Sequence, residues 1–361
     1  MDFFIRDNCR LCNSKNLQSV IKLEDTPPAN AFVDKNQLDI EQAKYPLELF
    51  ICQDCSHLQL TTVVNPKKLF ENYVYVSGTS PIFIKHFEDC SELIIKKYIP
   101  NKKKLVIDIG SNDGTLLKFY KDKGFNILGI DPAKAIAKEA TEKGINTIPK
   151  FFNQELAKEI LTNYGDASII SANNVFAHSD NLKEIIQGVK ELLCSEGLFI
   201  FEVSYLVDVF EKSLFDTIYH EHLAYHSVLP LINFFKKNEM ELIDVQRIPT
   251  HGGSIRGIVQ KLNGKRKVEE SIKSILSLED NLGINKYATL VNFSRKISEI
   301  KNNLTKLLKE IKGNGKTIAG FGAPAKATTL MYQFGIDSKT IDFIVDDNPL
   351  KQGKFTPGLK I

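Results

Sequence analysis

The alternation of apolar and polar residues in the middle of the chain predicts a parallel sheet with crossover helices. Leu105–Ile109 and Asn126–Ile130 are short apolar runs rich in branched residues, as expected of buried parallel strands. Between them, Leu116, Leu117 and Tyr120 recur at helical spacing. We therefore expect this segment to form a βαβ unit.

The same alternation continues downstream. Residues 166–178 predict a further strand with its loop, 185–193 predict an amphipathic helix, and 197–202 predict the next strand. Strands that alternate with helices in this way indicate an α/β fold of the Rossmann-like class.

A second, shorter βαβ pattern lies near the end of the chain. A polar helix over 292–312 precedes strands at 317–320 and 341–345, and the second strand ends in Asp346. Taken alone, this pattern is typical of a dinucleotide-binding unit and favours a dehydrogenase. Pro324 in its turn and the few remaining residues argue against a full half of such a domain. The helix is expected to pack through an apolar stripe made of Leu304, Leu307, Leu308 and Ile311.

Four cysteines form two C-x-x-C pairs near the N-terminus. Cys9 and Cys12 make the first pair, Cys52 and Cys55 make the second, and 39 residues separate them. Two such turns can complete a tetrahedral Cys₄ zinc site, and a site filled by four protein ligands is structural. The gap predicts an inserted loop, which residues 26–34 and the segment after them fit. The alternatives are two independent surface turns or a redox pair.

Composition and charge narrow the class of protein. The chain has 361 residues, of which 43% are hydrophobic and 25% charged, with a net charge of +3; this excludes a disordered chain, a collagen-like repeat and a disulfide-dense scaffold. So small a net charge gives no reason to expect nucleic acid or a membrane as partner. No run approaches the roughly 20 apolar residues of a membrane span, and the N-terminus is unlike a secretory signal. We expect a cytoplasmic protein, with Cys90 and Cys194 in its core.

The first βαβ unit carries the features of a nucleoside site. Gly110 and Gly114 form a turn directly after the first strand, and Asp131 ends the second strand. Glycines let the backbone approach a ligand, and the acid can accept hydrogen bonds from ribose hydroxyls. The middle glycine of the dinucleotide fingerprint is missing, and Asp108 stands two residues before the first glycine. This pattern is typical of S-adenosylmethionine-dependent methyltransferases, with another nucleotide as the alternative.

Histidine, tyrosine and glutamate are concentrated at 215–227. On an extended segment, His220 and His222 would share one face, with Tyr219 and Glu221 on the other. Histidine titrates near neutral pH and a neighbouring carboxylate can orient it, so the cluster suits acid–base chemistry. A second metal site and a histidine-rich surface loop are the alternatives.

A polar loop follows at residues 250–256. Its two glycines and the guanidinium of Arg256 suit a phosphate or pyrophosphate, and His251 lies beside them. An ordinary turn between strands is the alternative.

Taken together, these blocks resemble the sugar C-methyltransferases, and within them the carbon-3 methyltransferases of tetronitrose formation. The blocks are the cysteine pairs, DIGSNDGTLL, NNVFAHSDN, YHEHLAYHS, THGGSIR and GFGAPAKATTL, and they extend over essentially the whole chain. The resemblance implies methylation of carbon in a nucleotide-linked 4-keto-6-deoxy sugar, with S-adenosylmethionine as donor and a structural Zn²⁺. It also implies a monomer.

The resemblance further implies roles for particular residues. His222 would remove a proton beside the ketone, oriented by Glu221. Tyr219 would lie beside the enolate oxygen or return a proton. His178 would line the same pocket, and Tyr73 or Tyr75 would close over the sugar. The expected donor contacts are Asp108, Gly110, Asn112, Asp113, Gly114, Asp131, Pro132, Asn173 and Asn174. The expected substrate contacts are His220, His251, Arg256 and Lys326.

The family's organisation implies three domains. Residues 1–75 would form the zinc-binding domain, 76–290 the Rossmann-like methyltransferase domain, and 291–361 a helical linker with a shortened Rossmann-like segment. O- or N-methylation of a related sugar is a second enzymatic hypothesis. A non-catalytic zinc- and nucleotide-binding protein is a hypothesis of a different class.

Overall fold

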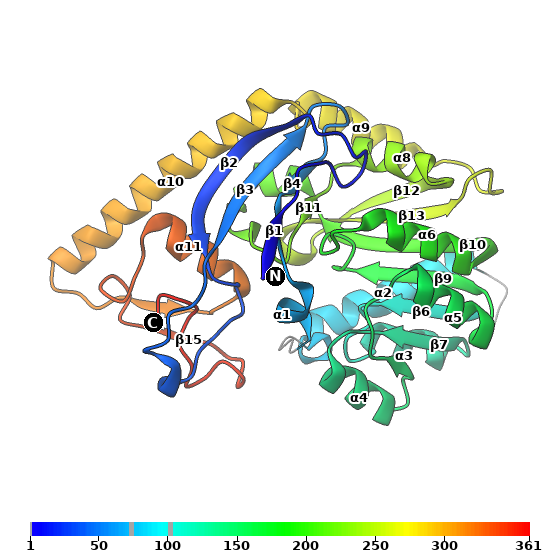
Figure 1. Ribbon diagram of the computed structural model, residues 1–361, viewed down its shortest axis with the longest axis horizontal. Helices are drawn as coiled ribbons and strands as arrows, with labels where there is room; N and C mark the ends of the chain where they lie inside the picture. The colour runs from blue at the N-terminus through cyan, green and yellow to red at the C-terminus, as the bar shows by residue number, and fades with distance from the viewer. Residues whose placement is uncertain (1, 72–75, 100–103) are drawn as a thin grey trace. The chain divides into compact units, whose positions relative to one another are not determined.

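The computed structural model describes residues 2–71, 76–99 and 104–361, which divide into two compact units (Figure 1). One unit combines Met1–Leu69, Tyr205–Ser227 and Glu279–Ile361, and the other combines Phe70–Ser204 and Val228–Leu278. We refer to them as the first and second unit. No helix in the described ranges is long and apolar enough to span a membrane.

The second unit is built on a seven-stranded sheet. Its strands lie in the order β12-β13-β10-β9-β6-β7-β8, and β13 alone runs antiparallel to its neighbours. The strands are β6 (Leu105–Ile109), β7 (Asn126–Ile130), β8 (Thr147–Ile148), β9 (Ala167–Asn173), β10 (Leu193–Ser204), β12 (Met240–Ile248) and β13 (Ser254–Lys261). The helices that precede, connect and follow these strands are α2 (Pro81–Tyr98), α3 (Thr115–Asp122), α4 (Lys134–Glu142), α5 (Gln154–Tyr164), α6 (Leu182–Leu192), α8 (Val228–Lys237) and α9 (Glu270–Leu282).

The order of the strands creates a switch point at β6. The chain leaves β6 through α3 to pair β7 on one side, and β9 later pairs with the other side of β6. In open α/β sheets, ligands bind outside the carboxyl ends of the strands at such a point. The fold therefore places a binding site at the end of β6, where the glycine turn stands.

The central strands are buried on both faces, as continuous apolar runs require. Val106 and Ile107 of β6 and Ile169 and Ile170 of β9 have no exposed surface. The predicted strands at 105–109 and 126–130 are confirmed, as is the burial of both Cys90 and Cys194. Helix α6 begins before the predicted residue because Asn181 caps it by accepting from the backbone N–H of Glu184.

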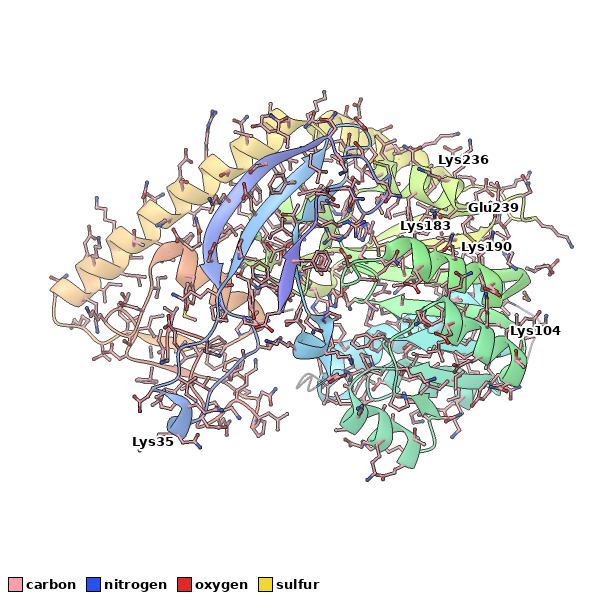
Figure 2. All side chains as sticks on the ribbon, viewed as in Figure 1. Lys35, Lys104, Lys183, Lys190, Lys236 and Glu239 are labelled. Atoms are coloured by element: carbon pink, nitrogen blue, oxygen red, sulfur yellow. The ribbon has the colours of Figure 1, made fainter. Side chains whose placement is uncertain are left out.

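Lysines on the surface of the second unit pair with nearby acids. Lys190 of α6 donates to Glu239, which precedes β12, and both side chains are labelled in Figure 2. Lys118 and Asp122 form an i,i+4 pair on α3. Exposed pairs of this kind add little stability, so these lysines form a solvated surface.

The first unit joins segments that lie far apart in the sequence. β11 (Ala224–Tyr225) pairs with β4, so the histidine-rich segment adds a strand to the N-terminal sheet. The order of this antiparallel sheet is β11-β4-β3-β2, and β1 pairs with β5 in a separate ladder. The elements are β1 (Phe3–Ile5), β2 (Leu17–Thr26), β3 (Tyr45–Cys52), β4 (Leu58–Leu60), β5 (Thr62–Val64), α1 (Pro66–Phe70) and α7 (Leu206–Glu211).

This pairing divides the chain differently from the predicted domain boundaries at 75 and 290. Residues 205–227 belong with the cysteine-bearing segment and the C-terminal segment, although they were expected in the central domain. The reason is a backbone interaction: Ala224 and Tyr225 pair with Gln59 and Leu58, and the N–H of Leu60 donates to Leu223. Such pairing between distant segments leaves no local signal in the sequence.

The helix predicted over 292–312 is longer than expected. α10 (Tyr287–Gly313) runs beside β2 (Figure 1) and buries Leu290, Phe293 and Ile297 in its first half. The predicted stripe in its second half is only partly covered, and Leu307 is 52% exposed. The prediction of a helix is confirmed, but the residues that pack lie in the first half of α10 and not in the second half.

The predicted second βαβ pattern is present as a two-stranded parallel sheet. β14 (Ala319–Phe321) pairs with β15 (Phe343–Val345), and α11 (Ala325–Phe334) connects them. The carboxylate of Asp346 accepts the backbone N–H of Ala323 at 2.7 Å, and Lys351 donates to the oxygen of Ala323. The turn after β14 is thus already bonded to the carboxylate of Asp346, the acid that would otherwise contact a dinucleotide. This arrangement does not favour the dehydrogenase hypothesis.

Candidate functional site

The four paired cysteines lie together in the first unit. Their sulfur atoms all fall within 4.8 Å of one another. Cys9 lies 3.5 Å from Cys55, and Cys12 lies 3.5 Å from Cys52, measured between Sγ atoms. All four are free thiols rather than disulfides.

Two matching turns bring these thiols together. In the first turn the N–H of Cys9 donates to the oxygen of Ser14, and the oxygen of Cys9 accepts from the N–H of Asn13. In the second turn Cys52 makes the same two bonds with His57 and Ser56. Asn13 and Ser56 hold equivalent places with positive φ values of 66° and 63°. The intervening residues form β2, a loop and β3, so the predicted insertion at 26–34 is confirmed as the connection between two paired strands.

The donor set fits zinc. Tetrahedral coordination at a Zn–S distance of about 2.3 Å separates the sulfurs by roughly 3.8 Å, close to the separations found here. A metal binds cysteine as the thiolate, so zinc would bind here with release of the thiol protons. Four cysteine ligands fill the tetrahedron, so this zinc site is structural.

The glycine turn of the second unit wraps the carboxyl end of β6. Gly110, Asn112 and Gly114 have positive φ values of 71°, 51° and 79°. A side chain on Gly110 would place its Cβ 2.2 Å from Cγ2 of Val175. The turn is also bonded to the end of β7, because Gly110 and Ser111 both donate to the oxygen of Ile130.

Two polar groups at this turn fit a nucleoside. One oxygen of Asp131 accepts the N–H of Asn112 at 2.9 Å, and the other accepts the N–H of Ala133, which follows Pro132, at 2.8 Å. These bonds fix the carboxylate at the end of β7, where an acid contacts ribose hydroxyls. Asn173 ends β9, and its amide nitrogen and oxygen are both buried without a hydrogen-bond partner among the residues that the structure describes. A buried amide in this condition needs a partner, which the donor cofactor can supply.

Asp108 lies beneath the turn rather than at its surface. It is 4% exposed and accepts a 2.6 Å hydrogen bond from the hydroxyl of Ser171. Burial, together with the charges of Asp131 and Glu202, raises the pKa of Asp108 to about 7. A direct contact between Asp108 and the cofactor stays a prediction, because its observed bond is to the neighbouring strand.

The raised pKa makes stability depend on pH. Between about pH 4 and pH 7 folded Asp108 keeps a proton that the unfolded chain has released, so stability falls as pH rises through this range. We expect Asp108→Asn, which resembles the protonated acid, to lack this loss. The free energy of unfolding of the variant, measured relative to that of the parent, should be roughly 2–4 kcal/mol higher at pH 8 than at pH 4. Urea unfolding at both pH values measures this difference. An equal change in the free energy of unfolding with pH for the parent and for Asp108→Asn would refute the prediction. The exposed substitution Asp122→Asn is the control.

Arg256 lies inside the second unit and is engaged by the protein. Glu202 stands directly opposite on β10, and its Oε1 accepts from Nε of Arg256 at 2.6 Å. Although burial opposes ionisation, the hydrogen bond from His86 and the charge of Arg256 hold the pKa of Glu202 below its usual range. Arg256 is 5% exposed, so its placement does not favour the predicted phosphate contact.

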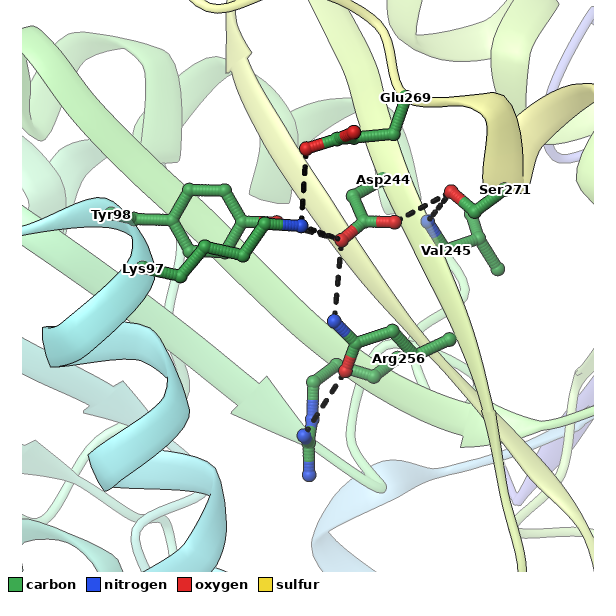
Figure 3. A network of polar contacts seen from close by, with 8 residues as sticks. Lys97, Tyr98, Asp244, Val245, Arg256, Glu269 and Ser271 are labelled. Atoms are coloured by element: carbon green, nitrogen blue, oxygen red, sulfur yellow. Dashed lines mark hydrogen bonds and ion pairs between the residues drawn. The ribbon is translucent and has the colours of Figure 1, made fainter.

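A polar network continues from Arg256 toward α2 (Figure 3). Arg256 contacts Gln246, which donates to the carboxylate of Asp244. Asp244 also accepts from Tyr98 at 2.7 Å and Lys97 at 3.0 Å. These bonds hold α2 to the sheet, so Arg256 has a structural role in the second unit.

Two further predicted residues lie in loops of the second unit. His251 is exposed, has a positive φ of 53° and lies 4.7 Å from the ring of Phe83. His178 follows β9 and stacks on Phe70 at 5.7 Å. Asn174, which follows Asn173, has a positive φ and donates its N–H to the oxygen of Glu202.

The histidine-rich segment of the first unit forms a turn. The N–H of His222 donates to the oxygen of Tyr219 at 2.9 Å, so these residues do not alternate across two faces. The expectation of an extended segment was therefore wrong. The turn leaves Tyr219 and His222 half-buried, with their rings 4.2 Å apart, while His220 and Glu221 are buried.

His222 is held in a defined tautomer. Its Nδ1–H donates to the backbone oxygen of Thr217 at 2.8 Å, so the neutral ring carries its basic lone pair on Nε2. Glu221 accepts from the amide of Asn30 at 2.8 Å. Sequence reasoning missed Thr217, since a backbone oxygen has no signature in the sequence.

His220 has a different environment. It is 1% exposed, and its Nε2–H donates to the oxygen of Tyr45 at 3.2 Å. Burial lowers the pKa of His220 to about 4, so the ring is neutral at pH 7. This environment favours a structural role, and its predicted contact with substrate remains a prediction.

Helix α11 supports the same turn. The hydroxyl of Thr329 donates to the oxygen of Ile218 at 2.7 Å. Lys326 lies 3.9 Å from Asp216 and is 43% exposed. The YHEH and GAPAK blocks, about a hundred residues apart, thus form one cluster in the first unit. Tyr73 and Tyr75 lie outside the described residues.

Family models match almost the whole chain. Residues 9–70 match a zinc binding domain, residues 85–244 match a methyltransferase domain, and residues 249–361 match a C-methyltransferase C-terminal domain. Together with the switch-point turn and the four-cysteine cluster, these matches define an S-adenosylmethionine-dependent methyltransferase with a structural zinc site.

A relative of known activity specifies the family. C-methyltransferase NovU of Streptomyces niveus is 32% identical over 355 residues, which cover 98% of this chain and 84% of NovU. The chain belongs to the C-methyltransferase family. It therefore transfers a methyl group from S-adenosylmethionine to carbon.

Two solved structures show a more distant likeness to this chain. PH0226 of Pyrococcus horikoshii OT3 is 14% identical, with 54% of this chain and 98% of that chain covered and a TM-score of 0.42. Magnesium protoporphyrin IX methyltransferase of Synechocystis PCC 6803, with bound SAH, is 17% identical, with 49% and 83% covered and a TM-score of 0.38. Because both TM-scores are low, the assignment rests on the family models and NovU.

Proposed function

We propose that the protein methylates a carbon beside the ketone of a nucleotide-linked 4-keto-6-deoxy sugar, with His222 as the base. The observation that carries this proposal is the fixed tautomer of His222, whose Nδ1–H is bonded to Thr217. The sugar class is supported by the resemblance of the YHEH, THGGSIR and GAPAK blocks to sugar C-methyltransferases.

A hydrogen beside a ketone becomes removable when the resulting enolate is stabilised. Nε2 of His222 takes this proton, and the oxygen of Thr217 stabilises the imidazolium through the Nδ1–H bond. Tyr219 lies against the His222 ring and supplies a hydroxyl for the enolate oxygen. The proton moves from the sugar carbon to His222, and the electron pair of the broken C–H bond remains on the substrate.

The second unit holds the methyl donor. Asp131 accepts from the ribose hydroxyls, the amide of Asn173 gains its missing partner, and the glycine turn lets the backbone approach closely. When bound, S-adenosylmethionine supplies an electrophilic methyl group for the nucleophilic carbon. In this proposal Lys326, which belongs to the same unit as His222, contacts the sugar substrate.

The test is methylation of a panel of nucleotide-linked sugars with and without a 4-keto group. With S-adenosylmethionine, we expect only the 4-keto-6-deoxy members to gain the mass of one methylene unit. Carbon NMR of the product should then show a methyl group on carbon beside the ketone. Transfer to non-keto sugars at equal rate, or to no member of the panel, would refute the proposed substrate class.

A further inference from the structure

The segment before α2 is bonded to the glycine turn of the donor site. The N–H of Ser77 donates to Oδ1 of Asn112, and the N–H of Gly78 donates to Oδ2 of Asp113, both at 2.9 Å. We call Val76–Ser80 the strap. The side-chain oxygens of Asn112 and Asp113, which were expected to contact the cofactor, are thus bonded to the strap.

Gly78 is required by the close approach of the strap to the turn. A Cβ at this position would lie 2.3 Å from Oδ2 of Asp113 and 2.9 Å from Oγ1 of Thr115. Gly78 is not among the residues with positive φ, so its backbone conformation is open to alanine. The short distances to Asp113 and Thr115, of which the one to Asp113 is the shorter, exclude a side chain.

The two carboxylate oxygens of Asp113 accept hydrogen bonds from different segments. Its Oδ1 accepts from the hydroxyl of Thr115 at 2.7 Å and from the N–H of Thr115 at 3.2 Å, which fixes the start of α3. Its Oδ2 accepts from the strap. The carboxylate is therefore held by its own helix in the position that receives Gly78.

A second contact, between α2 and β10, holds the segment that follows the strap. His86, in the second turn of α2, donates from Nε2 to Oε2 of Glu202 at 2.7 Å, and Glu202 is near the carboxyl end of β10. Residues 76–86 are thus bonded to the turn after β6 and to the end of β10. β9 lies between these two strands and ends at Asn173, whose buried amide has no partner within the described ranges.

We propose that the strap closes over the methyl donor, and that Gly78 and Asp113 are positioning residues that hold it closed. Release of S-adenosylhomocysteine then requires the bonds from Ser77 and Gly78 to open. This inference rests on the donor alone and is independent of the sugar.

Gly78→Ala tests the strap. The added methyl group forces the strap from Asp113, and loss of one hydrogen bond should speed release of S-adenosylhomocysteine about fivefold. Radiolabelled S-adenosylhomocysteine bound to the full chain is chased with unlabelled ligand and followed by rapid filtration, without sugar. Hydrogen exchange of the peptide containing Val76–Ser80 should also become faster. Gly313→Ala, whose Cβ meets nothing within 4 Å, is the control and should release at the parent rate.

A double substitution tests whether Asp113 is the partner. Asp113→Ser removes Oδ2 while keeping an oxygen that can accept from the N–H of Thr115. In this background, Gly78→Ala should change the release rate by less than about twofold. Parent-like release by Gly78→Ala alone would overturn the strap, and equal effects in both backgrounds would overturn the role of Asp113.

Discussion

His222→Ala should lower the rate of methyl transfer by about 10²–10⁴-fold, the usual contribution of a positioned general base. The variant loses Nε2, the atom that would take the proton from the sugar carbon, while the donor site in the second unit keeps all its residues. Affinity for S-adenosylmethionine should therefore stay within about twofold of the parent value, because no donor contact is removed. Single-turnover methyl transfer and calorimetric titration of the donor measure the two quantities.

Chemical rescue distinguishes a lost base from a disturbed fold. Imidazole added to His222→Ala can occupy the space left by the ring and should restore part of the rate. A variant that retains the parent rate would exclude His222 as the base. A variant that also loses donor binding would show that the change acts on the fold instead.

Cys52→Ser should remove the structural zinc and unfold the sheet that carries it. Cys52 ends β3, which pairs with both β2 and β4, so loss of the metal acts on the centre of this sheet. Zinc in a four-cysteine site contributes on the order of 10 kcal/mol to folding at pH 7, which is comparable to the whole free energy of unfolding of a typical domain. Metal analysis should give one zinc per parent chain and much less in the variant.

Cys194→Ser is the matched control, because Cys194 is buried in β10 away from the cluster in the sequence. It should retain zinc. Limited proteolysis should cut the β2–β4 region only in Cys52→Ser. Zinc-free parent protein, or a Cys52→Ser variant with a full zinc content, would contradict the structural site.

The features predicted correctly are those with a local signal. The cysteine cluster, the buried strands at 105–109 and 126–130, and the position of Asp131 directly after the second of these strands each depend on a few consecutive residues. The turn chemistry of glycine and the period of apolar residues determine such elements directly. The resemblance to C-methyltransferases is also carried by short blocks, and the family models bear it out.

The features missed depend on partners far apart in the sequence. The turn at Tyr219–His222 is held by Asn30 and Thr329, through Glu221 and Ile218. The guanidinium of Arg256 looked available for a phosphate until the strand register placed Glu202 opposite. Opposite charges on paired strands attract, but the pairing itself is set by tertiary structure.

The central claim is that His222 forms an enolate on a keto sugar, and solvent hydrogen exchange tests it most directly. The protein is incubated in D₂O with a nucleotide-linked 4-keto-6-deoxy sugar and no methyl donor, and the sugar is analysed by mass spectrometry and NMR. We predict deuterium beside the ketone with the parent protein, and only the background level of the protein-free sample with His222→Ala. Equal exchange by the parent and the variant, or methylation of that carbon by a variant lacking His222 at the parent rate, would contradict the account.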